Sequence, residues 1–395
     1  MNTYQTKKLG ELVDEGIVQL TRGKVISKKD IVAHPGNYPI YSSAKENDGM
    51  FGRYGEFLFD EPLITWSVDG GGRLFYRPKH RFSVTNVGGI LRILKPELLD
   101  YRYLFYVLSL KHSEIRFDWV RKAHPSIIRE LYKGIPLPSL KQQRQIVKKL
   151  DDVFDGVAKA KKNAEKNLQN SKELFESYLQ SVFEKPGKGW EKMKLGDKEL
   201  LGIIDGDRGK NYPKKSDFLS DGYCLFMNTK NVRPDGFDFA TTMFVTEKKD
   251  KALGNGKLQR NDVVMTTRGT IGNLGLYSDD VKYEDIRINS GMLIFRPNTK
   301  RISPYYLFEI LRSGIMKTQI KKHVSGTAQP QLPIKTLVNF SIPVPTSLTE
   351  QRGIVKKLHS LLVETKKLGK MYEQKLADLD ELKKSVLSKA FHAEL

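Results

Sequence analysis

The chain has 395 residues, of which 39% are hydrophobic, and this is enough for two or three domains with cores of their own. Its formal net charge of +21 and isoelectric point near 9.6 indicate a polyanionic partner such as nucleic acid, although the same charge could serve solubility alone. The single cysteine, Cys224, excludes an internal disulfide and a cysteine-based zinc site, and it fits a reducing cytoplasm. No apolar run approaches the length of a membrane-spanning helix.

Residues 1–140 are expected to form a first domain. Short apolar runs alternate with Gly, Asp, Asn and Pro, which is typical of strands joined by turns, and residues 101–113 show the period of a helix. Polar loops in this region offer hydroxyl groups, cations and an aromatic ring, which are groups that contact phosphates and bases. The candidate DNA-binding residues of this domain are Tyr41, Ser42, Ser43, Lys45, Trp66, Arg73, Arg121, Lys122 and His124.

Residues 141–189 are expected to form a long helix followed by a linker. Apolar side chains recur at alternating spacings of four and three residues, which is typical of a coiled coil when it is sustained over several heptads. Pro186 and Gly187 end the helical pattern. The side chains predicted to face a partner helix are Ile146, Leu150, Val153 and Val157.

Residues 190–348 are expected to form a second domain of the same plan, with extra residues in its loops. Its clearest binding signal is a glycine-rich loop after the apolar strand 262–265, where an arginine suits guanine and an asparagine suits adenine. Similar polar loops occupy corresponding places in the first domain, and this recurrence favours a shared binding role over ordinary surface loops. The candidate DNA-binding residues here are Thr266, Thr267, Arg268, Thr270, Asn273, Lys322, Ser325, Thr327 and Gln329.

A short element occurs twice in the chain. Residues 142–150 read QQRQIVKKL and residues 350–358 read EQRGIVKKL, with seven of nine positions identical, and each copy follows a Pro-x-Pro run. Residues 349–395 are expected to form a second long helix that pairs with the first in antiparallel fashion, giving the chain approximate two-fold symmetry. The expected fold class is α+β, with two α/β domains joined by two long antiparallel coiled-coil helices. Further residues predicted at the helix pair and at a subunit interface are Gln143, Arg144, Gln351, Arg352, Ile354, Leu358, Leu361 and Leu368.

Signals for catalysis are weak. The sequence has no Walker-type run, and its seven histidines are scattered, so that no metal site is expected. Asp235, Glu247 and Lys249 match a loose arrangement in which nucleases hold Mg²⁺ with carboxylates and place a lysine beside the attacking water. A Pro-Asp-Gly turn and a solvated charge run explain the same residues. A stand-alone Mg²⁺-dependent nuclease therefore remains the alternative function.

The duplicated Gln-Arg elements, the heptad helix after each of them and the stretch Gly269-Thr270-Ile271-Gly272 carry a resemblance. On these residues the whole chain resembles the specificity subunit of type I restriction–modification systems. The first domain departs from this wording, with Asp69-Gly70-Gly71-Gly72 at the corresponding place.

The resemblance implies a non-catalytic DNA-binding subunit. Each globular region would be a target recognition domain that reads one half-site, and the helices would set the distance between the half-sites. The implied partners are double-stranded DNA, two adenine-N6 methyltransferase subunits and ATP-dependent restriction subunits. The sequence lacks the Asn/Asp-Pro-Pro-Tyr/Phe tetrapeptide of adenine methylation. No cofactor is therefore expected on this chain, and S-adenosylmethionine, ATP and Mg²⁺ are expected on the partner subunits.

Overall fold

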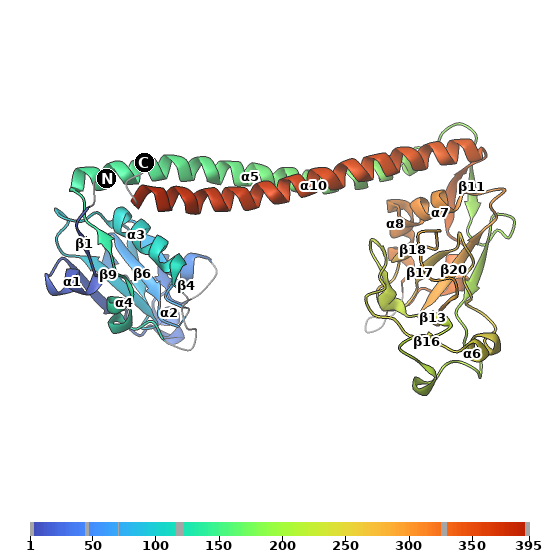
Figure 1. Ribbon diagram of the computed structural model, residues 1–395, viewed down its shortest axis with the longest axis horizontal. Coiled ribbons are helices and arrows are strands. Elements are labelled where there is room, and N and C mark those ends of the chain that lie inside the picture. The colour runs from blue at the N-terminus through green and yellow to red at the C-terminus, as the bar shows by residue number, and fades with distance from the viewer. Residues whose placement is uncertain (1–3, 44–46, 70, 116–121, 325–329, 392–395) are drawn as a thin grey trace. The chain divides into compact units, whose positions relative to one another are not determined.

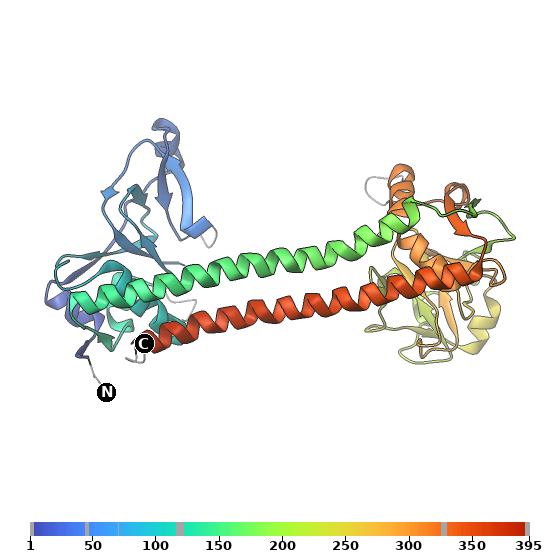
Figure 2. The ribbon, with the colours of Figure 1, turned by 90° about the horizontal axis from the view of Figure 1, so that it is seen from above.

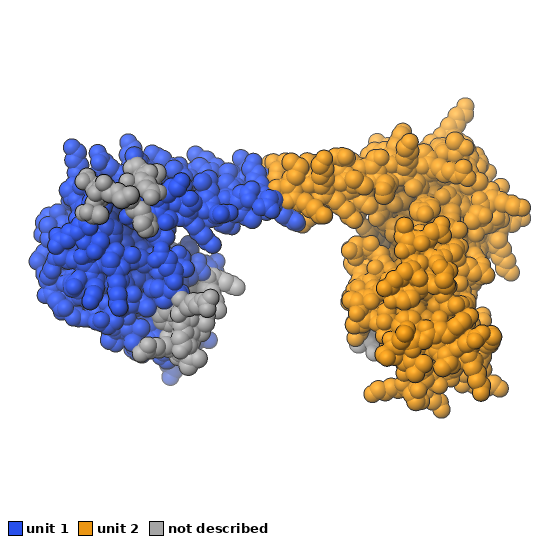
Figure 3. Space-filling model, viewed as in Figure 1, with its two compact units in different colours: residues 1–165, 373–395 blue, residues 166–372 orange. Residues whose placement is uncertain are grey.

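The computed structural model describes residues 4–43, 47–69, 71–115, 122–324 and 330–391. The chain divides into two compact units, residues 1–165 with 373–395 and residues 166–372 (Figure 3). Each unit contains one globular region and a part of each long helix. Within the described ranges, no helix is both long enough and apolar enough to cross a membrane.

The first unit is built on an antiparallel sheet with the strand order β2-β9-β6-β7. Every position of β6 is buried because both faces of the sheet are covered: Ile64 packs toward the helices, and Leu63 packs toward a second sheet. The predicted helix over residues 101–113 is confirmed as α3, which lies against β7 and β6. The elements are α1 (Leu9–Asp14), β2 (Val18–Arg22), β6 (Leu63–Ser67), β7 (Leu74–Arg77), β9 (Gly88–Ile93), α3 (Tyr101–Glu114) and α4 (Pro125–Leu131).

The second sheet of this unit has the order β4-β3-β8-β5, and its central strands β3 and β8 run parallel. A small apolar cluster of Leu63, Phe82, Val84 and Ile90 fills the space between the two sheets. The second sheet therefore packs against the first through this cluster and has loops of its own. Its elements are α2 (Lys28–Ala33), β3 (Tyr38–Tyr41), η1 (Asn47–Gly49), β4 (Met50–Tyr54), β5 (Phe59–Asp60) and β8 (Arg81–Val84).

The second unit repeats this plan. Its antiparallel sheet has the order β12-β20-β17-β18, and its other sheet has the order β16-β13-β19 with β13 parallel to β19. The sheets and covering helices of this unit are made of β12 (Leu201–Asp205), β13 (Cys224–Met227), β16 (Phe244–Val245), β17 (Val263–Thr266), β18 (Leu274–Leu276), β19 (Ile286–Ile288), β20 (Met292–Pro297), α7 (Pro304–Arg312) and α9 (Ile334–Leu337). Elements in its longer loops are η2 (Lys215–Asp217), η3 (Thr229–Asn231), β14 (Val232–Arg233), β15 (Gly236–Phe237), α6 (Glu247–Ala252) and α8 (Gly314–His323).

Each globular region is closed by a ladder between its first and last strands. In the first unit β1 (Thr6–Lys7) pairs with β10 (Ile135–Pro136), and in the second β11 (Trp190–Lys194) pairs with β21 (Ser341–Pro345). The Pro-x-Pro runs lie in these closing ladders. The phenol groups of Tyr103 and Tyr306 donate to the carbonyls of Pro136 and Pro343 at 3.0 and 2.8 Å, so the same contact occurs in both units.

The glutamines of the duplicated element lie inside the protein. Gln143 is 0% exposed, accepts from the backbone N–H of Asp100 at 2.9 Å and donates to the carbonyls of Leu98 and Pro138. Gln351 makes the same set of bonds with Ser303, Arg301 and Pro345. These glutamines fasten a domain to the start of its helix, whereas they had been predicted at the helix pair and a subunit interface. The neighbouring Arg144 and Arg352 have exposed side chains.

The long helices α5 (Leu140–Glu184) and α10 (Leu348–Phe391) lie side by side in Figure 1 and Figure 2. In the first unit the start of α5 packs against the end of α10, because Val147 and Leu150 share a core with Val386 and Ala390. In the second unit the end of α5 packs against the start of α10, where Leu179 shares a core with Leu358. The pairing is antiparallel, so the predicted fold class is confirmed.

The residues predicted for the helix seam differ in their burial. Leu150 and Val157 are buried, and the seven-residue spacing continues through the buried Ala164 and Ser171. Other predicted seam residues pack at its edge with partly buried side chains: Ile146, Val153, Ile354 and Leu361. Leu358 is buried, but Leu368 is 37% exposed and lies on the rim. The predicted domain boundaries at 140, 189 and 348 stay predictions.

Candidate nucleic-acid interface

In the first unit, three predicted segments meet at one edge of the globular region. The hydroxyl of Ser43 donates to the carbonyl of Val87 at 2.5 Å and accepts from the N–H of Asp69 at 3.3 Å. The N–H of Ala123 donates to the carbonyl of Val68 at 2.8 Å. Segments 41–43, 66–69 and 122–124, far apart in the sequence, are therefore neighbours in the fold.

Tyr41 and Ser42 lie at the end of β3 in this edge. The Tyr41 ring lies 3.5 Å below the guanidinium of Arg77, and burial lowers the pKa of Arg77 to about 10. Ser42 accepts a hydrogen bond from the hydroxyl of Thr85 at 2.9 Å. Both predicted side chains are partly buried, and contacts inside the domain fix their positions.

Trp66 does not belong to the exposed edge. Its side chain is 1% exposed, its indole N–H donates to the carbonyl of Ala123 at 2.7 Å, and its ring fills the space where Gly89 has no Cβ. A buried ring has no face on which a base could stack. Trp66 is therefore a core residue that anchors the 122–124 segment.

The remaining described candidates of this unit are at the surface. Arg73 is exposed, and its guanidinium lies 5.2 Å from the centre of the Phe75 ring. The ammonium group of Lys122 lies 3.4 Å from the carboxylate of Asp69, and His124 is the N-cap residue of α4. The predicted residues Lys45 and Arg121 lie outside the described residues.

In the second unit, the glycine-rich loop 266–273 leaves β17 at the corresponding edge. Thr266 and Thr267 are buried. The Thr266 hydroxyl donates to the carbonyl of Thr270 and accepts from the N–H of Asn273, and the Thr267 hydroxyl donates to the carbonyl of Gly291 at 3.1 Å. The Asn273 amide donates to the carbonyl of Val232 at 3.0 Å. These predicted DNA-binding side chains thus shape the loop, which presents the exposed Arg268 and Thr270.

Arg268 lines a polar hollow of about 430 Å³ at this edge. The backbone of Arg268 bridges to Gln331, and the N–H of Gly269 donates to the carbonyl of Pro330 at 3.3 Å. The hollow combines a cation, hydroxyls, side-chain amides and backbone groups, which suits hydrogen bonding to base edges or phosphates. Its lining residues are Thr229, Arg268, Gly269, Asn289, Ser290, Gly291, Pro330 and Gln331.

Part of this edge was not predicted from the sequence. Thr229, Asn289 and Arg208 were not among the candidates, yet Arg208 donates to the carbonyl of Ser290 at 3.3 Å, beside the hollow. The sequence signal here is an arginine between Gly206 and Gly209, shortly after β12. The predicted Lys322 is exposed on the last turn of α8, and Ser325, Thr327 and Gln329 lie outside the described residues.

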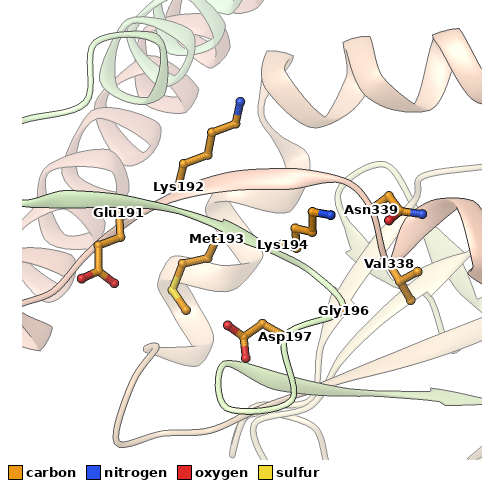
Figure 4. Close-up of a pocket in the computed structure, with 8 residues that line it drawn as sticks. All are labelled: Glu191, Lys192, Met193, Lys194, Gly196, Asp197, Val338 and Asn339. Carbon is orange, nitrogen blue, oxygen red and sulfur yellow. The ribbon is translucent and has the colours of Figure 1, made fainter.

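Another hollow lies beside β11 (Figure 4). Lys192 and Met193 point to opposite sides of the strand, as neighbours on a strand do. The lining includes the carboxylates of Glu191 and Asp197 together with lysine ammonium groups. This mixed charge gives no preference for an anion, and the hollow borders the β11–β21 ladder rather than the loop of Arg268.

The comparisons with known proteins agree with this organisation. Residues 1–168 and 187–376 match the family described as the type I restriction modification DNA specificity domain. The chain belongs to this family. It is 29% identical over 364 residues to the type I restriction enzyme MjaVIII specificity subunit of Methanocaldococcus jannaschii, covering 85% of this chain and 82% of the relative. A putative type I specificity subunit of Mycoplasma pneumoniae, S.MpnORF507P, is 25% identical, covering 87% of both chains.

Solved structures show the same fold. A chain from a study of complex assembly and conformational transition of the type I R-M system gives a TM-score of 0.72 at 18% identity, covering 100% of this chain and 99% of that chain. The HsdS subunit from Thermoanaerobacter tengcongensis gives 0.61 at 19% identity, covering 100% and 98%. The chain is accordingly a specificity subunit of a type I restriction–modification system.

The nuclease alternative finds no support in this family or in the structure. Asp235 lies in the turn of the β14–β15 hairpin, where the Pro-Asp-Gly pattern predicted a turn. The carboxylate of Glu247 pairs with Lys251 at 2.7 Å, and the ammonium group of Lys249 pairs with Asp217 at 3.0 Å. In the part of the chain that the structure describes, no group of three or more His, Cys, Asp or Glu residues could hold a metal ion.

Proposed function

We propose that this specificity subunit directs DNA methylation and restriction to a target made of two separate half-sites. The observation that carries the proposal is the repeated edge: each unit presents loops from equivalent strands of the same frame, and these loops differ in chemistry. Two readers of one design with different loops fit two half-sites of different sequence. The net charge of +21 supports backbone binding to DNA that weakens as salt rises.

The proposed readers are the exposed side chains of the two edges. In the second unit Arg268 is the leading candidate, because a guanidinium can bind two acceptors of a guanine at once. In the first unit Arg73 and Lys122 are exposed at the equivalent edge. Ser43, Thr266 and Asn273 act through the shape of the loops, since hydrogen bonds inside the domain use their side chains.

The proposed partners are methyltransferase subunits, with one docked on each half of the duplicated chain, and restriction subunits. The sequence contains neither the adenine-methylation tetrapeptide nor a Walker-type run. S-adenosylmethionine, ATP and Mg²⁺ would accordingly bind on those partners, and the complex would act on DNA in the cytoplasm.

Methylome sequencing of cells that carry the chain with its methyltransferase partner tests the proposal. We expect methylated adenines in a split sequence, with none when either component is absent. A matched test incubates the purified chain with DNA and Mg²⁺, and no cleavage is expected. Cleavage that is lost in Asp235→Ala or Glu247→Ala would favour the nuclease instead.

A further inference from the structure

A second repeated element follows the first strand of each main sheet. Residues 22–29 carry a cation at Arg22, Lys24, Lys28 and Lys29, and residues 208–215 carry one at Arg208, Lys210, Lys214 and Lys215. Each pair of positions is 186 residues apart, and neither segment contains a carboxylate. We call these segments the basic arms.

Both arms are held against the same turn of the frame. The guanidinium of Arg22 donates through Nε to the carbonyl of Asn86 at 2.8 Å, in the turn between β8 and β9. The guanidinium of Arg208 donates to the carbonyl of Ser290 at 3.3 Å, in the turn between β19 and β20. The two carbonyls are equivalent, because each lies two residues before the first residue of β9 or β20.

The backbone reaches this turn by different routes. In the first unit Arg22 pairs with Gly89 across the sheet. In the second unit the residue that pairs with the equivalent Leu293 is Asp205, which lies three residues before Arg208. Asp205 and Arg208 form an ion pair at 3.0 Å. The guanidinium contact is therefore kept although the chain has shifted by three residues, which favours a requirement for this cation at this place over inheritance of the local backbone.

Close packing and hydrogen bonds fix the backbone of both arms near their cationic residues. Gly23 lies so close to the next strand that a Cβ would come within 2.1 Å of the Val84 carbonyl. Just before the second arm, the buried Asp207 accepts from the N–H groups of Gly209 and Gly254 at 2.7 Å. Burial opposes the ionisation of Asp207, but these hydrogen bonds outweigh burial and hold its pKa below the usual range. A short helical turn begins at the end of each arm. There the backbone N–H of Ser27 or Lys214 donates to the carboxylate of Asp30 or Asp217, which lies just beyond the arm.

The lysines of the arms are exposed and stand beside the candidate edges. Lys24 bridges to Thr85, whose hydroxyl bonds Ser42 in the first edge. Arg208 contacts Ser290, which lines the hollow of Arg268 in the second. Base-reading groups must differ between two half-sites, but the phosphates of DNA are the same everywhere. A basic element that is repeated beside two different edges is therefore suited to binding DNA phosphates rather than bases.

We propose that the basic arms are equivalent phosphate-binding elements, which hold each recognition domain on its half-site independently of sequence. Arg22 and Arg208 position the arms, and the lysines contact the DNA backbone. This inference rests on the proposed function, since it presumes that both edges face DNA.

The test uses the full chain in complex with its methyltransferase partner. Lys24→Gln with Lys28→Gln neutralises part of the first arm, and Lys210→Gln with Lys214→Gln neutralises part of the second. Matched controls are Lys79→Gln with Lys133→Gln, and Lys198→Gln with Lys300→Gln. These control lysines are also exposed, but they follow the far ends of strands or adjoin the closing ladders. The measurement is the slope of log binding constant against log salt, on target DNA and on an unrelated duplex.

We expect each arm variant to reduce the slope by about 2, because each phosphate contact contributes about 0.9. Target and unrelated DNA should weaken by the same factor, the two arms should act alike, and the methylated sequence should stay the same. An unchanged slope with normal wild-type methylation would overturn the inference and leave the proposed function intact. An altered methylated sequence, or an effect from one arm only, would also overturn it. A wild-type complex that methylates no split site would count against the proposed function itself.

Discussion

The two recognition domains share a frame but differ in how their second sheet is held. In the first domain a small apolar cluster around Phe82 joins the sheets. In the second domain a buried ion pair is added: the guanidinium of Arg287 donates to the carboxylate of Asp250 at 2.5 Å, tying β19 to α6, and Lys257 contacts the same carboxylate at 2.7 Å. The difference shows that the main sheet and its ladder are the common scaffold, whereas the outer sheet can be supported by unlike interactions.

The largest expected effect comes from removing the ion pair that is found in the second domain. Asp250→Ala leaves Arg287 buried without its carboxylate, which costs about 3–5 kcal/mol of stability. We expect hydrogen exchange to show faster opening in the second domain, with the first domain unchanged. Glu247→Ala is the matched control, since this carboxylate on the same helix is exposed. Equal loss of protection in both domains would show that they do not unfold separately.

The next prediction concerns the glutamine contact that the two domains share. Gln143→Ala and Gln351→Ala each remove a buried side chain that satisfies three backbone groups, and we expect each to cost about 3 kcal/mol. Each loss should appear by hydrogen exchange in its own domain only. Arg144→Ala and Arg352→Ala, one residue further on, should have little effect because both side chains are exposed. Unequal costs would mean that the two glutamine contacts are not equivalent in energy.

A smaller effect concerns recognition by the second domain. We expect Arg268→Ala to weaken binding of the complex to its target by about 1–3 kcal/mol, with a much smaller change on unrelated DNA. Arg233→Ala, at an exposed arginine of the β14–β15 hairpin, is the control. Titrations of both duplexes measure the change, and an equal loss on both would assign Arg268 to phosphate contact alone.

The smallest effect is a difference in acid sensitivity. Burial opposes the ionisation of Asp250, but hydrogen bonds from Lys257 and Arg287 outweigh it and lower its pKa below 3.8. The stabilisation is complete above the pKa of the unfolded state and is lost as the pH falls through the lower folded pKa. Unfolding of the second domain measured below pH 4 should therefore depend less on pH in Asp250→Asn than in the wild type. A parallel pH dependence would exclude this carboxylate as the cause.

The sequence predicted the frame well because its signals are local. The duplicated Gln-Arg element, the Pro-x-Pro runs and the heptads of Leu150 and Leu358 each depend on neighbours along the chain. The edge was harder to predict, because contacts such as Ser43 with Val87 join segments that only the folded sheets bring together. Trp66 resembled a stacking platform, but a strand covered on both faces has no outward position. The basic arms recur in the sequence 186 residues apart, but only the folded structure shows which turns they contact.

The closing ladders have a consequence for how such proteins change over time. Because β1 pairs with β10 and β11 pairs with β21, the first and last strands of each domain lie side by side. The long helix that follows is fastened by a glutamine whose bonds reach mainly backbone groups, so they depend little on neighbouring side chains. Each domain is thus an exchangeable module, joined to the rest of the chain by the same closing ladder and the same glutamine contact. Genetic recombination at the repeated junction sequences could exchange one module for another and produce a new target specificity in a single step, without redesign of the assembly.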